Sequence, residues 1–257
     1  MRYTGRMANV RAIGLQLQVC GTYEAMSRAA AGLICAELQE RPNLLLCVSA
    51  GGTPTRTYEL LAARRARKPR LFATMKVIQI DEWGGLTPGD PAACSTDLRL
   101  KLLQPLGIAH NRFTALRTDA RDPEAECDRV ETWLAANGPI DICILGLGLN
   151  GHVAMNEPAE AISPYVHVAT LAASSRNHAM LKGVAKKPRY GLTLGMADIL
   201  CSRRILLLVN GERKRPALKR LMTPSVTARY PASFLWLHPD TTVLCDRSAA
   251  EHLAACR

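Results

Sequence analysis

Short apolar runs alternate with helical stretches along this chain, and this alternation constrains the fold more than any other feature. Each run is continuously apolar rather than alternating in polarity, which is typical of strands covered on both faces. Strands that alternate with helices indicate an α/β fold with a parallel, doubly wound sheet. The predicted strands are residues 44–48, 76–80, 140–145, 205–209 and 241–245.

Helix candidates fill the intervals between these strands. The first carries apolar residues at helical spacing, and the second has a proline at its first helical position. The candidates are residues 23–39, residues 54–67 with Thr53 as their cap, residues 122–136, and a stretch after Ser174 that carries His178 and Lys182.

Composition fits one domain over residues 1–257, because 48% of the residues are hydrophobic and no convincing linker interrupts the pattern. The net charge of +11 can indicate nucleic acid, an anionic membrane or anionic small molecules as partners. The basic residues are scattered, however, and their cluster at residues 64–70 is placed to end a helix, where cations favour the dipole. Aromatic residues make up only 5% of the chain. We therefore expect no nucleic-acid partner.

Nine cysteines at irregular spacing, without a CxxC pair, argue against a disulfide framework and against a zinc site. Several lie inside apolar runs, where cysteine behaves as a small hydrophobic residue. We see no signal peptide, and no apolar stretch approaches the roughly 20 residues that a membrane span needs. The expectation is a soluble cytoplasmic protein without a membrane or metal partner.

Ligands of doubly wound folds gather at the carboxyl ends of the strands, so the residues after each strand are candidates for a site. After residues 44–48, the segment SAGGTP can form a phosphate cradle at a helix N-terminus, or only a tight turn. After residues 76–80, Asp81 can be a general base or a helix cap. After residues 205–209, Lys214 can meet an anionic ligand or belong to a solvated helix start.

The richest segment follows residues 140–145 and reads GLGLNGHVAMNEP, residues 146–158. It contains three glycines together with Asn150, His152 and Glu157. An imidazole exchanges protons near neutral pH, and a carboxylate can orient it. A glycine-rich turn with one surface histidine is the alternative. Taken together, the four strand ends favour an enzyme that acts on a small phosphorylated sugar or carbonyl compound.

Four blocks, in this order, resemble the glucosamine-6-phosphate deaminase/isomerase family. They are SAGGTP, IDEWGGL, GLGLNGHVAMNEP, and YGLTLGMADIL followed by ILLLVNGERK, and the likeness runs from about Leu44 to Cys245. The segments HAMLK, TLGMADIL and PASFLWLH are most similar to the galactosamine-6-phosphate isomerase/deaminase branch.

The resemblance implies a fold and a reaction. The fold is a modified Rossmann-like sheet shared with ribose-5-phosphate isomerase and 6-phosphogluconolactonase. The reaction converts galactosamine 6-phosphate or glucosamine 6-phosphate to tagatose or fructose 6-phosphate and releases ammonia, without a cofactor or metal. An oligomer is possible.

The resemblance also implies roles for individual residues. Asp81 is the base that moves a proton from C2 to C1, His152 opens the pyranose ring, and Glu157 orients His152. Glu82 supports the loop. Gly51, Gly52 and Thr53 hold the phosphate, and Lys214 neutralises it.

Two positions depart from the family pattern. Asn150 stands where many deaminases have Asp, so we expect His152 to be a weaker base. The phosphate-binding arginine of the family falls on Leu181 without a gap, and we expect Lys182 or Arg176 to replace it.

Two other functions compete with this interpretation. The first is a 6-phosphogluconolactonase, whose sequences resemble GxDGHTASLFP and DER rather than NGHVAMNEP and DEW. The second is a non-catalytic sugar-phosphate sensor, such as the effector domain of a repressor. A repressor needs a helix-turn-helix segment, but the roughly forty residues before the first block suggest one strand and one helix of the core. The sequence does not choose between the two hexosamine epimers.

Overall fold

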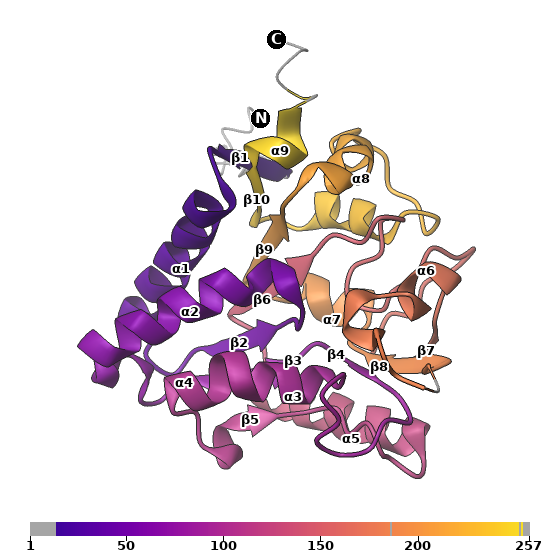
Figure 1. Cartoon of the computed structure of the whole chain (residues 1–257), viewed down its shortest axis with the longest axis horizontal. Coiled ribbons are helices and arrows are strands. Elements are labelled where there is room, and N and C mark those ends of the chain that lie inside the picture. The colour runs from indigo at the N-terminus through magenta and orange to yellow at the C-terminus, as the bar shows by residue number, and fades with distance from the viewer. Residues whose placement is uncertain (1–13, 186, 252, 254–257) are drawn as a thin grey trace, which may run out of the picture.

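A seven-stranded parallel sheet forms the centre of the molecule. The computed structural model describes residues 14–185, 187–251 and 253 (Figure 1). The strand order is β1-β10-β9-β6-β2-β3-β5, and every neighbouring pair is parallel. The strands are β1 (Leu15–Cys20), β2 (Leu45–Val48), β3 (Lys76–Gln79), β5 (Phe113–Thr114), β6 (Ile142–Gly146), β9 (Arg204–Val209) and β10 (Thr241–Asp246).

Helices cover both faces of this sheet, which confirms the doubly wound prediction. On one face α1 and α2 run side by side (Figure 1), together with α3 and α4, which a π-helical turn at Arg99–Leu103 joins. On the other face lie α5, α7, α8 and α9. The helices are α1 (Tyr23–Glu40), α2 (Gly52–Arg67), α3 (Cys94–Leu98), α4 (Gln104–Leu106), α5 (Pro123–Asn137), α6 (Ala173–Arg176), α7 (Met196–Leu200), α8 (Arg215–Leu221) and α9 (Arg247–Ala250).

Each central strand places alternate side chains in two separate apolar cores. In β2, Leu46 and Val48 pack toward α1 and α2, whereas Leu45 and Cys47 pack toward the opposite layer. This explains the continuous apolar runs, because neither face of the sheet is left to water. The eight cysteines of the described residues are free, and burial raises the pKa of the Cys47 thiol well above its ordinary value.

The predicted helix starts are right for α5 and wrong for α2. Asp122 caps α5 by accepting from the amides of Glu124 and Ala125. Helix α2 begins earlier than expected, at Gly52, and Gly51 occupies its cap position without a side-chain hydrogen bond. The hydroxyl of Thr53 is therefore not a cap. It donates instead to Oδ1 of Asn210, 2.9 Å away.

A second, antiparallel sheet was not predicted. It contains β4 (Asp81–Trp83), β8 (Tyr190–Thr193) and β7 (His167–Thr170), in that order. Only Ile80 separates β3 from β4, so the chain passes directly from the main sheet into the small one. The helix expected after Ser174 is also replaced by shorter elements, α6 and a 3-10 turn at Ala179–Leu181, with His178 and Lys182 on either side of that turn.

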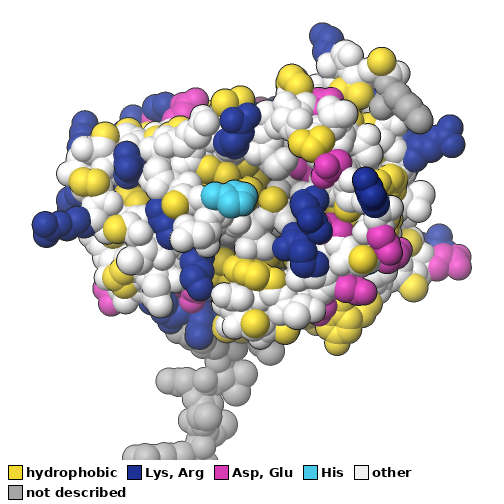
Figure 2. All heavy atoms as spheres, turned by 90° about the horizontal axis from the view of Figure 1, so that it is seen from below, with side chains coloured by type: hydrophobic (Ala, Val, Ile, Leu, Met, Phe, Trp, Pro, Cys, Tyr) yellow, Lys and Arg dark blue, Asp and Glu magenta, His cyan; other side chains and the backbone are white. Residues whose placement is uncertain are grey.

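The positive charge of the chain is spread over its surface. On the face in Figure 2, Lys and Arg side chains are dispersed among acidic, apolar and neutral ones rather than gathered in one continuous patch. The last turn of α2 carries Arg64, Arg65 and Arg67, as the sequence predicted for a helix end. Within the described residues, no helix combines the length and apolar character required to cross a bilayer.

Candidate active site

A cavity of about 850 Å³ opens at the carboxyl ends of the central strands. Loops that follow β2, β3, β6 and β9 line it, and so does the connection between β7 and β8. Its lining brings together most of the residues that the sequence singled out, namely Gly51, Gly52, Thr53, Asp81, Asn150, His152, Glu157 and Lys214. Arg176 and Lys182 are exposed and lie outside this lining.

The loop after β2 presents backbone donors to the cavity. Gly51 has φ of 103° and ψ of −171°, a conformation that strongly favours glycine. Its amide donates to Oδ2 of Asp97 at 3.0 Å. Within the described residues, the next two amides, of Gly52 and Thr53, have no acceptor. They point from the first turn of a sixteen-residue helix, the arrangement that binds phosphate groups in many proteins.

Two tyrosines fix this loop. The hydroxyl of Tyr58 donates to the carbonyl of Ser49 at 2.7 Å, and its side chain is fully buried. From α1, the hydroxyl of Tyr23 donates to the carbonyl of Gly52 at 2.9 Å. The two contacts hold the backbone of the cradle from both sides, so its free amides are pre-positioned for an anion.

Asp81 is the first residue of β4, and its carboxylate faces the cavity. Within the described residues, no hydrogen-bond donor contacts that carboxylate. Burial, and then the negative charge of the neighbouring Glu82, raise the pKa of Asp81 to about 7. A carboxylate with this pKa is suited to take and return a proton near neutral pH.

The carboxylate of Glu82, unlike that of Asp81, accepts several hydrogen bonds from the protein. Its side chain is fully buried and accepts from Nε2 of Gln79 at 3.0 Å and from the amides of Trp83, Cys94 and Ser95, each at 2.8 Å. It thereby joins β4 to the start of α3. Glu82 supports the loop, and its oxygens are already occupied by donors from the protein.

His152 and Glu157 form a pair in the glycine-rich loop after β6. Nδ1 of His152 lies 3.4 Å from Oε2 of Glu157, an ion-pair distance that is longer than an ideal hydrogen bond. Gly148 makes room for the imidazole, since a Cβ at that position would lie only 2.5 Å from the ring. Gly151, in the same loop, adopts φ of 90°, a backbone conformation that is strained for a residue with a side chain.

Two further groups fix the Glu157 carboxylate. Nδ2 of Asn150 donates to Oε2 at 2.8 Å, and the hydroxyl of Ser175 donates to Oε1. Oδ1 of Asn150 accepts from the backbone amide of His152 at 3.1 Å, so Asn150 contacts Glu157 and the backbone. Burial alone would raise the pKa of Glu157, but the contacts from His152, Ser175 and Asn150 lower it to about 2.

Lys214 supplies a cation on the side of the cavity near β9. It lies in the 3-10 turn Glu212–Lys214, and its Nζ donates to the carbonyl of Leu147. Burial, followed by the charge of Arg213, lowers the pKa of the Lys214 ammonium. The lysine therefore joins the loops after β6 and β9 at the rim of the cavity.

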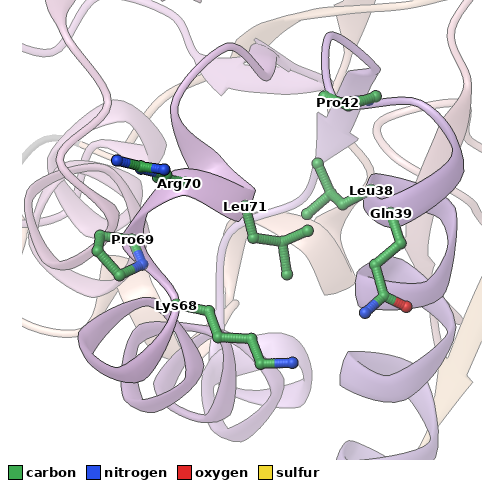
Figure 3. Close-up of a pocket in the computed structure, with 7 residues that line it drawn as sticks. All are labelled: Leu38, Gln39, Pro42, Lys68, Pro69, Arg70 and Leu71. Carbon is green, nitrogen blue, oxygen red and sulfur yellow. The ribbon is translucent and has the colours of Figure 1, made fainter.

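A second hollow, of about 580 Å³, lies where α1 and α2 end (Figure 3). Its lining contains no carboxylate and no histidine: Leu38, Gln39, Pro42, Lys68, Pro69, Arg70 and Leu71. The carboxylates and the histidine that the sequence singled out line the larger cavity instead.

Comparison with known proteins places the chain in a family. Residues 21–244 match the family described as glucosamine-6-phosphate isomerases/6-phosphogluconolactonase. The AgaI protein of Escherichia coli (strain K12), whose name describes it as a candidate deaminase, is 38% identical over 87% of this chain and 89% of its own. Glucosamine-6-phosphate deaminase 1 of Bacillus subtilis (strain 168) is 34% identical over 92% of this chain and 98% of its own. The chain belongs to the glucosamine-6-phosphate isomerase/6-phosphogluconolactonase family.

Solved structures show the same fold. A monomeric glucosamine-6-phosphate deaminase of the NagB superfamily superposes with a TM-score of 0.88 at 34% identity, covering 92% of this chain and 99% of that chain. The 6-phosphogluconolactonase of Trypanosoma brucei superposes with a TM-score of 0.74 at 20% identity, covering 94% of this chain and 99% of that chain. The second likeness shows the fold alone, whereas the first extends to sequence.

Proposed function

We propose that this protein converts a hexosamine 6-phosphate to the corresponding ketose 6-phosphate and ammonia. One observation carries the proposal: Asp81, with a pKa of about 7, shares a cavity with the His152–Glu157 pair and with the backbone cradle of α2. The deaminase relatives support the same activity. We further propose a cytoplasmic location, in keeping with the free cysteines of the described residues, of which all but Cys201 are buried.

The phosphate end of the substrate is assigned to α2 and to Lys214. The free amides of Gly52 and Thr53 and the positive end of the helix attract a dianion. Lys214, which lines the same cavity, adds a positive charge. Anchoring the phosphate in this way extends the sugar ring across the cavity toward Asp81 and His152.

Ring opening is assigned to His152. The imidazole takes the proton of the anomeric hydroxyl and returns one to the ring oxygen, which breaks the bond between C1 and that oxygen. Glu157 stabilises the charged imidazole between these steps and is itself fixed by Asn150 and Ser175. The product of this step is the open-chain aldehyde.

Proton transfer between carbons is assigned to Asp81. Its carboxylate removes the proton of C2 while the C1 oxygen takes up a proton from solvent, which gives an enolamine. The carboxylate then delivers its proton to C1, and nitrogen releases a proton to solvent, which leaves an imine at C2. Water adds to this imine, and ammonia departs as the ketone forms. The absence of fixed donors on Asp81 suits this task, because the carboxylate must hold the proton and release it in turn.

We propose galactosamine 6-phosphate as the first substrate to test, because HAMLK, TLGMADIL and PASFLWLH resemble that branch of the family. Purified protein would be supplied separately with galactosamine 6-phosphate, glucosamine 6-phosphate, their N-acetyl forms and 6-phosphogluconolactone. Ammonia would be measured for the sugars and acid for the lactone. Ammonia from a free amino sugar is the expected result, and the faster epimer names the substrate. Turnover of the lactone alone would overturn the proposal.

A non-catalytic sugar-phosphate sensor makes a different prediction in the same experiment. It would bind the sugar phosphates without releasing ammonia from any of them. The grouping of Asp81, His152 and Glu157 in one cavity favours catalysis over this alternative.

A further inference from the structure

His178 lies against the backbone cradle, although the sequence did not select it for the site. It precedes the 3-10 turn at Ala179–Leu181 and lines the same cavity as Gly51 and Asp81. Its Cε1 is 3.9 Å from the point that a Cβ on Gly51 would occupy. The imidazole therefore lies directly beside the loop to which we assign the phosphate.

The protein backbone sets which nitrogen of His178 carries the proton. The amide of Met180 donates to Nδ1 of His178 at 3.3 Å, so Nδ1 acts as an acceptor. In the neutral ring the proton then resides on Nε2. Nε2 adjoins Cε1, the ring atom nearest the cradle, and within the described residues it has no acceptor. The ring thus offers one unused donor beside the cradle.

Neighbouring groups keep this ring a neutral donor. Burial, and then the positive charges of His152 and Lys214, lower the pKa of His178, while the negative charge of Asp97 acts in the opposite direction. His178, His152 and Lys214 all line the same cavity. Trp83 steadies the ring from another side, with its ring centroid 5.9 Å away and the two planes tilted by 40°.

The other basic residues of this segment are less well placed. His178, Arg176 and Lys182 are all exposed, but only His178 belongs to the lining of the cavity, and Leu181 is fully buried. A phosphate on the cradle already has the amides of Gly52 and Thr53 on one side and Lys214 on another. The connection between β7 and β8 also lines this cavity, and His178 is its residue that lies against Gly51.

We propose that Nε2 of His178 donates a hydrogen bond to the substrate phosphate, so that this residue, rather than Arg176 or Lys182, completes the phosphate site. The proposal deepens the proposed function and rests on it for the identity of the substrate. Its core claim concerns the binding of a phosphate group and can be tested without turnover.

The decisive comparison is between His178→Leu and His178→Gln. Leucine removes the donor, whereas glutamine retains an amide N–H near the position of Nε2. Binding of inorganic phosphate is measured by titration calorimetry, and KM and kcat are measured for the best hexosamine 6-phosphate. Lys219→Ala, at an exposed position outside the cavity lining, is the control for a substitution away from the site. Thermal unfolding verifies that each variant is folded.

The expected result is a roughly tenfold or greater weakening of phosphate binding in His178→Leu, with substantial recovery in His178→Gln and no change in Lys219→Ala. KM should rise by a similar factor while kcat changes little. Unchanged phosphate binding in a folded His178→Leu would overturn the inference, as would an equal loss confined to Arg176→Ala or Lys182→Ala. A protein that releases no ammonia, yet loses phosphate binding with His178→Leu, would refute the proposed function and support this inference.

Discussion

Two aspartates, one at the amino ends of the central strands (the amino edge) and one at their carboxyl ends (the carboxyl edge), have opposite electrostatic environments. At the amino edge, Asp141 precedes β6 and accepts from the amide of Leu45 at 2.8 Å, and it pairs with Arg41 at 3.1 Å and Arg203 at 3.2 Å. At the carboxyl edge, Asp81 is largely buried, its carboxylate accepts from no donor among the described residues, and its pKa is raised to about 7. At the amino edge, a backbone donor and two arginines balance the negative charge of Asp141. At the carboxyl edge, the negative charge of Asp81 is left unbalanced, and this is the residue to which we assign the proton transfer.

The largest effect should come from Asp81→Asn. An amide of the same shape cannot accept the C2 proton, so turnover should fall by about 1,000-fold or more. Ammonia release at saturating substrate measures this loss. Asp119→Asn, at an exposed position, is the matched control and should keep full activity. A substantial rate in Asp81→Asn would break the comparison by showing that the uncompensated carboxylate has no part in catalysis.

Asp81→Asn also tests how much the unbalanced carboxylate of Asp81 lowers the stability of the fold. Because the folded-state pKa of Asp81 is raised from 3.8 to about 7, folding is favoured below pH 4 and loses this contribution as pH rises through 7. Asp81→Asn should therefore be more stable than wild type at pH 8, by on the order of 2 kcal/mol, and the difference should vanish near pH 4. Urea unfolding at both pH values gives the two numbers. Equal stability at pH 8 would contradict an uncompensated carboxylate.

Glu157→Gln should have the next largest effect. It removes the charge beside His152 while preserving the shape of the side chain, and we expect kcat to fall about 100-fold with little change in KM. The pKa of Glu157 is lowered from 4.5 to about 2, so wild type should lose stability as pH falls through this window, and the variant should not. Steady-state kinetics and acid unfolding measure the two effects. Glu160→Gln, at an exposed ion pair, is the control.

Asp141→Ala tests the other edge of the sheet. The substitution leaves Leu45, Arg41 and Arg203 without their shared acceptor, and we expect the free energy of unfolding to fall by about 1–3 kcal/mol. The kcat and KM of the folded protein should stay within experimental error of wild type. If Asp141→Ala instead lowered kcat without lowering stability, the conclusion that the amino edge serves stability and the carboxyl edge serves catalysis would be wrong.

Asn150→Asp should give the smallest effect and sharpen the account of the catalytic loop. The new carboxylate would replace a donor to Glu157 with a like charge, which should raise the pKa of Glu157 and lower kcat about threefold. The pH–rate profile measures both changes. A higher kcat would show instead that a charge at this position strengthens His152 as a base, which was the expectation from the family pattern.

Much of this fold could be predicted because one physical rule governs its centre. Strands buried on both faces need continuous apolar runs, and β2, β3, β6, β9 and β10 all follow them. The same rule located most of the site. Since parallel strands end at one edge, the residues just after them converge, and eight of the ten predicted site residues line one cavity.

The rest of the site could not be found in this way. The small sheet is made of strands of three or four residues with polar or partly exposed side chains, such as the DEW of β4, which give no apolar run. Ser175 and His178 reach the cavity from the connection between two of these strands, so no preceding core strand marks them. Arg176 and Lys182 have the right charge in the sequence, but that charge carries no information on which way their backbone turns.

The hairpin of β7 and β8 has a consequence for how new specificities arise. Thr170 pairs with Tyr190, and the amide of Leu171 donates to the carbonyl of Arg189 at 3.2 Å, so the segment between them leaves and returns at one place. Asp81 and His152 belong to other loops, whereas Ser175 of this segment contacts Glu157. A connection of this kind tolerates changes in sequence and length better than the strands that it joins. Related enzymes, natural or engineered, can therefore acquire different substrate contacts here while keeping Asp81 and His152, provided that the contact with Glu157 is retained.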